Sequence, residues 1–556
     1  LRVLADLAGE ANNRDEQLRY LRKILQLYPQ DKNVRAYVEF LAPSKPKRDE
    51  GYAWDKDRAM AEAQKPPEKG ERTRILHKLA VTTVFQNGLA SRFHQIVFQP
   101  LTDEAAAEAR QFFLQYEADR QEVELRLSRV YRKDGTVAEA IESGEVAANN
   151  PAIAMYTSVR MFAVSFPRLS PGDVVELRYR IDDVSTRNEV ADAFYDVEYI
   201  QERDPVADAE YVLIAPKSRA LSTFTHNLAA TPEIKEDGDQ KIYRYSVKNL
   251  PGLPPEPAQA PTSEIVGQIH VSTFKTWDEV GKWYWALAKD QLDVDDTVKK
   301  KLGEITKTAK TDADKVRAVY HYATSLRYVA LEFGLEGIKP RRCALTMARG
   351  WGDCKDKATV IVTMLRELGI PSTLVLVRTG MRGDLPKDAP PSLGVFDHAI
   401  AYVPSLDLYL DGTAEGTGST HLPAMNRGSV ALQINEGNAK LVRLPNASPE
   451  SSPHNRKISV AVSQDGSAAF SIDTSVAGVN ASAWRGRYQP EGTRRERAAQ
   501  DLTTFFSSVE LGKDSGSLVV REVDDVEKPF GLSARGKAPA YARREGDVLS
   551  MPTASS

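Results

Sequence analysis

Hydrophobic and polar residues alternate with a period of two along two long parts of the chain. The alternation is clearest over residues 123–128 and 175–181, and it returns over residues 458–472. This pattern is typical of strands that bury one face and leave the other in water. We therefore predict an antiparallel β-sandwich over residues 75–250 and a second β-domain, expected to be truncated, over residues 455–556.

A helical period replaces the alternation at the start of the chain. Apolar residues recur at steps of three and four over residues 18–28 and again over 34–41, which predicts a helical hairpin within residues 1–42. The stretch from Leu25 to Asp31 resembles the end of a tetratricopeptide repeat. Two interpretations stay open: the last unit of a repeat array that binds protein partners, or an isolated hairpin packed on the next domain.

The middle of the chain mixes both periods. We predict an α+β domain over residues 271–445, with a helix opened by Thr276, another over 313–326, and a buried strand over 374–377. Charge and proline dominate residues 43–74, predicted to be a linker with a short helix near 55–63, and prolines dominate residues 251–270, predicted to be a connector. The fold class is thus multidomain α+β.

Cys354 stands at the start of a further predicted helix of this domain, one face of which is apolar. Gly352 and Asp353 precede it, and Gly369 ends the helical pattern. The first turn of a helix has free N–H groups and the positive end of the macrodipole, so a thiol placed there is expected to ionise readily and to act as a nucleophile. The charged run from Lys355 to Lys357 is predicted to be a solvated face of the helix.

A histidine and an aspartate end up near each other in the predicted strands that follow. His398 heads one strand and Asp411 ends the next, and a short turn between them predicts a hairpin that places both at one end. With Cys354 they form a candidate catalytic triad: nucleophile, proton carrier and orienting carboxylate. Asp397 and Asp407 are rival carboxylates.

The tetrahedral intermediate of such chemistry needs hydrogen-bond donors for its oxyanion. The backbone N–H of Cys354 is a candidate donor, and Trp351 is a candidate for the second. Two alternatives stay open beside catalysis. Cys354 can be an inert buried thiol, or it can form a disulfide with Cys343, the other cysteine of the chain.

Three blocks of sequence resemble a known family. Residues 351–358, 396–399 and 409–413 are similar to the core blocks of the bacterial transglutaminase-like superfamily, in a layout with an uncharacterised β-sandwich domain upstream. The resemblance implies a papain-like thiol fold and a triad of Cys354, His398 and Asp411. It leaves the reaction open among proteases, amidases, peptide N-glycanases and amide-transferring enzymes. Animal transglutaminases have Gly-Gln-Cys-Trp where this chain has Gly-Asp-Cys-Lys, so their calcium dependence and glutamine specificity are not implied.

Composition narrows the function classes. A formal charge of −3 from 74 basic and 77 acidic residues provides no global field for nucleic acid. Two cysteines exclude a disulfide scaffold or a four-cysteine zinc site, and we expect neither cofactor nor metal. No apolar run in this fragment approaches the length of a transmembrane helix. The resemblance favours the bacterial cell envelope or periplasm over the cytoplasm.

The functional hypothesis is a cysteine-dependent acyl-transfer enzyme that acts on peptide or other amide bonds through a thioester, with hydrolysis favoured over transamidation. The alternative is a protein-binding module of a larger bacterial protein in which the thiol site is vestigial.

Overall fold

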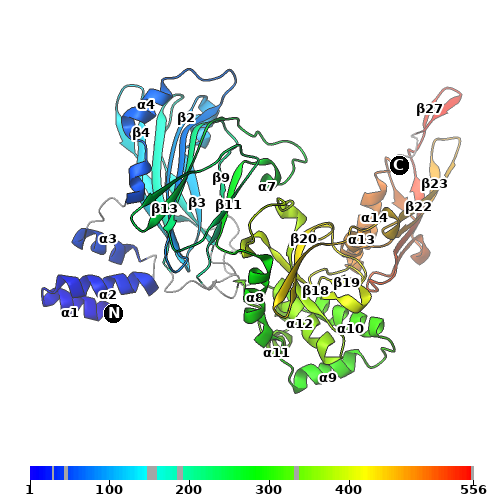
Figure 1. Cartoon of the computed structure of the whole chain (residues 1–556). Coiled ribbons are helices and arrows are strands. Elements are labelled where there is room, and N and C mark those ends of the chain that lie inside the picture. Colours follow the sequence, from blue (N-terminus) through cyan, green and yellow to red (C-terminus); the bar gives the residue numbers. More distant parts are fainter. Residues whose placement is uncertain (28–30, 43–47, 147–158, 185–191, 331–336, 552–556) are drawn as a thin grey trace.

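The computed structural model describes residues 1–27, 31–42, 48–146, 159–184, 192–330 and 337–551. Figure 1 shows N-terminal helices, a domain built on a large sheet, an α+β core and C-terminal sheets, in chain order from blue to red. The multidomain α+β class is confirmed.

The N-terminal helices are α1 (Arg2–Glu10), α2 (Arg14–Leu27) and α3 (Lys32–Leu41). Asp31 caps α3 by accepting a hydrogen bond from the Val34 N–H at 3.1 Å. The predicted hairpin corresponds to α2 and α3, and α1 adds a third helix whose Ala5 packs with Leu21 and Ile24. Residues 28–30, between α2 and α3, lie outside the described residues, and the resemblance to a tetratricopeptide repeat stays a prediction.

Much of the segment predicted to be a linker packs on the large sheet. It contains η1 (Arg48–Tyr52) and α4 (Lys56–Ala63). The Arg180 guanidinium, buried in the sheet, donates to both carboxylate oxygens of Asp49 at 2.6 and 2.8 Å. Trp54 is buried and stacks on His77 with ring centroids 4.1 Å apart. Residues 48–63 are therefore part of the sheet domain, because buried ionic and aromatic contacts attach them to it.

The large sheet has eight strands in the order β12-β13-β10-β1-β2-β8-β4-β5. Its neighbouring strands are antiparallel except for β1 and β10, which run parallel. The sheet is thus mixed, whereas alternation alone predicted an antiparallel one. Its strands are β1 (Thr73–Val84), β2 (Ala90–Pro100), β4 (Gln121–Tyr131), β5 (Val137–Glu139), β8 (Val174–Asp183), β10 (Val206–Pro216), β12 (Glu233–Asp237) and β13 (Gln240–Leu250).

Two three-stranded sheets accompany it. One has the order β3-β7-β6 and the other the order β11-β14-β9. The strand β14 falls in the predicted connector and runs into the predicted start of the α+β domain, so the chain remains in the sheet domain up to Ser272. The strands are β3 (Gln111–Glu117), β6 (Glu142–Val146), β7 (Val159–Ser165), β9 (Tyr195–Tyr199), β11 (Ser222–His226) and β14 (Gln268–Ser272).

The α+β core packs helices against a five-stranded antiparallel sheet of order β19-β18-β17-β20-β21. The predicted N-cap Thr276 accepts a hydrogen bond from the Glu279 N–H at 3.2 Å. The helices are α8 (Trp277–Ala288), α9 (Asp296–Ile305), α10 (Asp312–Ser325), α11 (Cys343–Arg349) and α12 (Cys354–Glu367). The sheet contains β17 (Thr373–Arg378), β18 (His398–Val403), β19 (Leu408–Leu410), β20 (Val430–Asn435) and β21 (Asn438–Arg443), and a short pair joins β15 (Arg327–Tyr328) to β16 (Trp351–Gly352).

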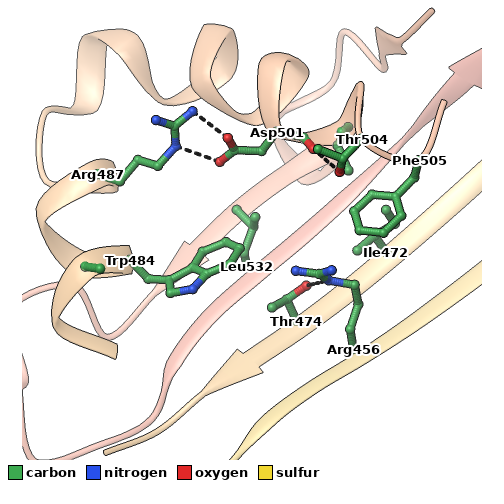
Figure 2. A pocket seen from close by; sticks show the side chains of 11 residues that line it. Arg456, Ile472, Thr474, Trp484, Arg487, Asp501, Thr504, Phe505 and Leu532 are labelled. Atoms are coloured by element: carbon green, nitrogen blue, oxygen red, sulfur yellow. Dashed lines mark hydrogen bonds and ion pairs between the residues drawn. The ribbon is translucent and has the colours of Figure 1, made fainter. Parts of the chain in front are cut away.

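The C-terminal part packs α13 (Asn480–Tyr488) and α14 (Arg494–Leu502) over a sheet in which β23 (Ala468–Val476) pairs with β22 (His454–Val462) and β26 (Phe530–Ala538). The alternating pattern predicted strands here, and the two helices are additions to them. A cavity of about 500 Å³ lies beneath these helices, with Trp484 and Phe505 in its lining (Figure 2). Its lining contains neither cysteine nor histidine, so the candidate thiol site lies elsewhere.

Candidate active site

Cys354 is the first residue of α12, as the sequence predicted. Asp353 is the N-cap: its side chain accepts from the Asp356 N–H, and the Asp356 side chain accepts in return from the Asp353 N–H. This capping box uses the N–H of the third helical residue and leaves that of Cys354 available at the helix start. The Cys354 side chain is partly exposed. The local sequence therefore presents a thiol and a free backbone donor at the same point.

His398 and Asp411 are brought together by the hairpin of β18 and β19. Ala401 pairs with Leu410 and Val403 with Leu408, so the histidine at the start of β18 faces the aspartate just after β19. The His398 Nε2 atom lies 3.0 Å from Asp411 Oδ2, and both side chains are buried. The helix α12 packs on β18, and Cys354 and His398 line the same hollow, close enough for the thiol to raise the pKa of the imidazole. Because Nε2 faces Asp411, Nδ1 is the ring nitrogen free to face the thiol.

Electrostatics favour a charged imidazole at this position. Burial by itself would lower the pKa of His398, but hydrogen bonds to Asp411 and Cys354 and their negative charge raise it to about 10. Burial would likewise raise the pKa of Asp411, yet its hydrogen bonds to His398 and Thr413 hold that pKa below its usual value. The pair is thus an imidazolium and a carboxylate at neutral pH.

This pair makes the stability of the core depend on pH. The unfolded pKa of histidine is about 6.5, below the folded value of about 10. The stabilising contribution is therefore complete below about pH 6.5 and is lost as pH rises through about 10. We expect the free energy of unfolding of the wild type, relative to His398→Gln, to fall over this interval. Denaturation followed by tryptophan fluorescence suits the test, because Trp277, Trp283 and Trp285 pack against the hydrophobic core of this domain. A pH-independent difference would contradict it.

The Asp411 carboxylate has further partners that the sequence did not indicate. Its Oδ1 atom accepts from the N–H and the hydroxyl of Thr413 at 2.8 and 2.7 Å. Its Oδ2 atom accepts from the Asn426 amide at 2.7 Å as well as facing His398. Asn426 is fully buried and follows in a turn after β19. No spacing rule connects such a turn residue to the hairpin, since only the folded chain brings it there.

The rival carboxylates have other roles. Asp397 accepts from the N–H and hydroxyl of Thr379 at 2.8 and 2.7 Å. Asp407 accepts from the Tyr402 hydroxyl at 2.8 Å at the far end of the hairpin. His398 therefore contacts Asp411, whereas these two carboxylates are hydrogen-bonded elsewhere in the described parts of the chain.

The charged residues after Cys354 are not a solvated face, as the sequence suggested. Lys355, Asp356 and Lys357 are at most 6% exposed. Lys355 forms an ion pair with Asp353, and Asp356 accepts from the backbone and guanidinium of Arg341 at 2.7 and 2.8 Å. The prediction was wrong because the first turn of α12 is buried against α11 and neighbouring segments. Asp353 and Arg341 serve as partners of Lys355 and Asp356, whereas the Lys357 ammonium has no hydrogen-bond partner among the described residues and burial lowers its pKa.

A hollow of about 300 Å³ opens beside the thiol. Cys354, His398 and Tyr284 of α8 are among its lining residues. Trp351, the expected oxyanion donor, does not line it; the indole lies against Arg349 and Arg341, with guanidinium carbons 5.2 and 5.6 Å from the ring centroid. A second hollow, of about 650 Å³, also borders His398 and Asp411.

The two cysteines are free, which contradicts the disulfide alternative. Cys343 lies in α11 and is fully buried, and burial raises the pKa of its thiol to about 12. It is therefore expected to be an inert thiol, in contrast to the partly exposed Cys354.

The described residues contain no group of three or more histidine, cysteine, aspartate or glutamate side chains placed to hold a metal ion. Over the same parts of the chain, no helix has the length and apolar character required to cross a bilayer.

Two family models match the chain. The Domain of Unknown Function with solved-structure structure (DUF3857) matches residues 86–254, and the Transglutaminase-like superfamily matches residues 299–402. The protein therefore combines a DUF3857 domain with a following transglutaminase-like core. No curated protein is a significant match.

One solved structure has a similar overall fold. The crystal structure of a putative protease from Parabacteroides distasonis ATCC 8503 is similar, with 16% identity and a TM-score of 0.55 over 84% of this chain and 93% of that one. This likeness shows the fold. A putative cysteine protease from Cytophaga hutchinsonii also matches, with 11% identity and a TM-score of 0.18 over 40% of this chain and 74% of that one; so low a score carries no argument.

Proposed function

We propose that the protein is a cysteine-dependent acyl-transfer enzyme that hydrolyses peptide or other amide bonds, with Cys354 as nucleophile. The contact between His398 and Asp411, with Cys354 lining the same hollow as His398 at a helix N-terminus, is the observation that carries the proposal. The transglutaminase-like core supports the same class of chemistry.

Acylation follows from the placement of the three groups. The Cys354 thiolate attacks the carbonyl carbon of the scissile amide, and the π electrons move to the oxygen. As the tetrahedral intermediate collapses, the C–N bond breaks and the His398 imidazolium donates its Nδ1 proton to the leaving amine. A thioester remains on Cys354, and His398 is now neutral with Nε2–H directed at Asp411.

Deacylation reverses the proton movement. Neutral His398 removes a proton from a water molecule whose oxygen attacks the thioester carbonyl, and the second tetrahedral intermediate expels the thiolate. The products are a carboxylic acid and the original thiolate–imidazolium pair. Asp411 acts as a positioning residue that keeps Nε2 protonated and Nδ1 facing the thiol.

The oxyanion requires two donors, and we assign them to the Cys354 N–H and the Tyr284 hydroxyl. Tyr284 is only 2% exposed, yet it borders the hollow that contains the thiol. Burial, with the negative charges of Cys354 and Asp353 nearby, raises the pKa of Tyr284, so its hydroxyl remains a donor. Trp351 is set aside as a donor because its indole lies against two arginines.

Replacement of Tyr284 by phenylalanine is expected to lower kcat by about 10²–10³-fold with little change in KM, the typical effect of losing one oxyanion donor. Release of nitrophenolate from p-nitrophenyl acetate measures it. Tyr320→Phe is the matched control, because this equally buried hydroxyl donates to the Thr417 carbonyl at 2.9 Å and does not line the hollow. Equal activity in the wild type and Tyr284→Phe would remove Tyr284 from the assignment.

The proposed function itself is tested by trapping the thioester. Incubation with p-nitrophenyl acetate followed by acid quench and peptide mass spectrometry should locate an acetyl group on Cys354, and none on Cys343. Cys354→Ala should give neither the thioester nor a burst of nitrophenolate. If the wild type shows no burst above Cys354→Ala, the enzyme proposal fails and the vestigial-site alternative gains support.

A further inference from the structure

We infer that the hollow beside Cys354 binds an apolar side chain of the acyl group, and that the upstream sheet domain supplies one wall of it through Tyr195. The inference rests on the proposed function and adds the class of acyl group and the domain that selects it. It assigns the DUF3857 domain a part in the active site.

Half of the residues that line this hollow are aromatic or aliphatic. Its volume of about 300 Å³ is at the lower end of ligand pockets, which span about 300–1,000 Å³, so it suits one side chain and adjoining peptide atoms. The apolar and aromatic lining residues are Tyr195, Tyr284, Ile338, Leu376, Leu393, Phe396 and Ala399.

The charged residues of its lining, Lys355, Arg382, Asp397 and His398, have partners within the protein, and His398 faces Asp411. Lys355 is paired with Asp353. The Arg382 Nε atom lies 3.6 Å from Asp397 Oδ2, and its NH1 group donates to the Gly394 carbonyl at 2.9 Å. A ligand charge would have to compete with these contacts, whereas apolar atoms can be buried against the remaining lining without loss of a hydrogen bond. The lining therefore favours an apolar side chain.

Tyr195 comes from a different domain than the thiol. It is the first residue of β9, which pairs with β14 in a small sheet of the upstream domain. Its side chain nevertheless packs against the hydrophobic core of the transglutaminase-like domain. The hollow therefore lies between the domains, and its wall on the upstream side belongs to the sheet domain.

Gly394 accounts for how closely the two domains approach. A Cβ atom on Gly394 would lie 2.2 Å from Tyr195 Cε2, closer than atoms can approach. The loop around Gly394 is held by the buried Arg378, whose guanidinium donates to the carbonyls of Gly383 at 2.9 Å and Val395 at 3.2 Å. The ring thus packs on a loop with little freedom to move away, and the wall is well defined.

Alkylation of Cys354 tests the pocket without requiring turnover. We compare the rates for N-benzyl iodoacetamide and iodoacetamide, each normalised to a small free thiol. In the wild type the apolar reagent should gain about tenfold, the order expected for one apolar group in a pocket, and Tyr195→Ala should remove most of this gain. Tyr199→Ala is the control, because Tyr199 ends the same strand, is 40% exposed and does not line the hollow.

Gly394→Ala should also reduce the preference for the apolar reagent, because the added methyl group must displace the Tyr195 ring or the loop around residue 394. This variant replaces Tyr195→Ala in the test if Tyr195→Ala does not fold. An unchanged reagent preference in either folded variant, or an equal loss in Tyr199→Ala, would overturn the inference. Preference without a nitrophenolate burst would leave the pocket standing and reject the proposed function. A nitrophenolate burst without a preference for the apolar reagent would support the proposed function and reject the pocket.

Discussion

Asp411→Asn is expected to lower kcat by about 10⁴-fold, as loss of the orienting carboxylate does in a comparable triad. Four donors converge on the carboxylate: the His398 ring, the Asn426 amide, and the N–H and hydroxyl of Thr413. The asparagine amide has only one oxygen to accept hydrogen bonds, so its NH₂ group must face either His398 and Asn426 or Thr413, all of which are donors. If the NH₂ group faces His398, the Nε2 atom must accept from it and the neutral ring carries its proton on Nδ1. The ring nitrogen beside the thiol then cannot act as a base.

A purely structural role of Asp411 would give a different pattern. If Asp411 positions His398, kcat should fall while KM changes little. The alkaline limb of the pH–rate profile of Cys354 acylation should also move to lower pH in Asp411→Asn, because the negative charge of Asp411 raises the pKa of His398. Asp407→Asn is the matched control. Asp407 has φ 47°, a backbone conformation that asparagine tolerates well, and it contacts Tyr402 rather than the histidine. Wild-type kcat in Asp411→Asn, or an equal loss in Asp407→Asn, would contradict the assignment.

Arg341→Met is expected to reduce the free energy of unfolding of the core by about 3–5 kcal/mol, the usual cost of breaking one side of a buried ion pair. The Arg341 guanidinium donates to Asp356 Oδ2 at 2.8 Å, and the two residues are 8% and 0% exposed. Removal of the cation leaves the Asp356 carboxylate buried beside Asp353 without its charged partner. Because Asp356 completes the capping box of α12, the first turn that carries Cys354 should loosen too.

Arg342→Met is the neighbouring control. The Arg342 side chain is 64% exposed and pairs with Asp293 at 3.0 Å, an arrangement worth about 0–1 kcal/mol. Urea denaturation followed by tryptophan fluorescence compares the two variants, and Arg341→Met/Asp356→Leu should recover part of the loss by removing the stranded charge. Similar stability of the two single variants would show that the Arg341 pair contributes no more than a surface pair.

Local patterns predicted the parts of the site that depend on near neighbours in sequence. Apolar periodicity and the preceding Gly-Asp placed Cys354 at the start of a helix, which the structure has from Cys354 to Glu367. Two apolar runs and a short turn predicted the hairpin of β18 and β19. Such features follow from the period of the backbone and the capping of its ends, and both are encoded within a few residues.

Contacts between residues far apart in the chain could not be predicted from such local patterns. The pairing of β1 with β10 is parallel, and a strand's own alternation does not specify its neighbour's direction. The sequence pattern predicted Lys355 and Asp356 to be surface charges, whereas in the fold both side chains are buried. Asn426, Tyr284 and Tyr195 reach the site from a turn, a helix and another domain.

The sequence by itself determined a multidomain α+β chain with a thiol at a helix start and a histidine and an aspartate in one hairpin. Only the tertiary structure decided which carboxylate faces the histidine, where the buried charges find partners, and that a tyrosine of the upstream domain borders the thiol. The physical reason is that hydrogen-bond geometry and desolvation depend on which segments meet, and the meeting of segments is a property of the whole fold.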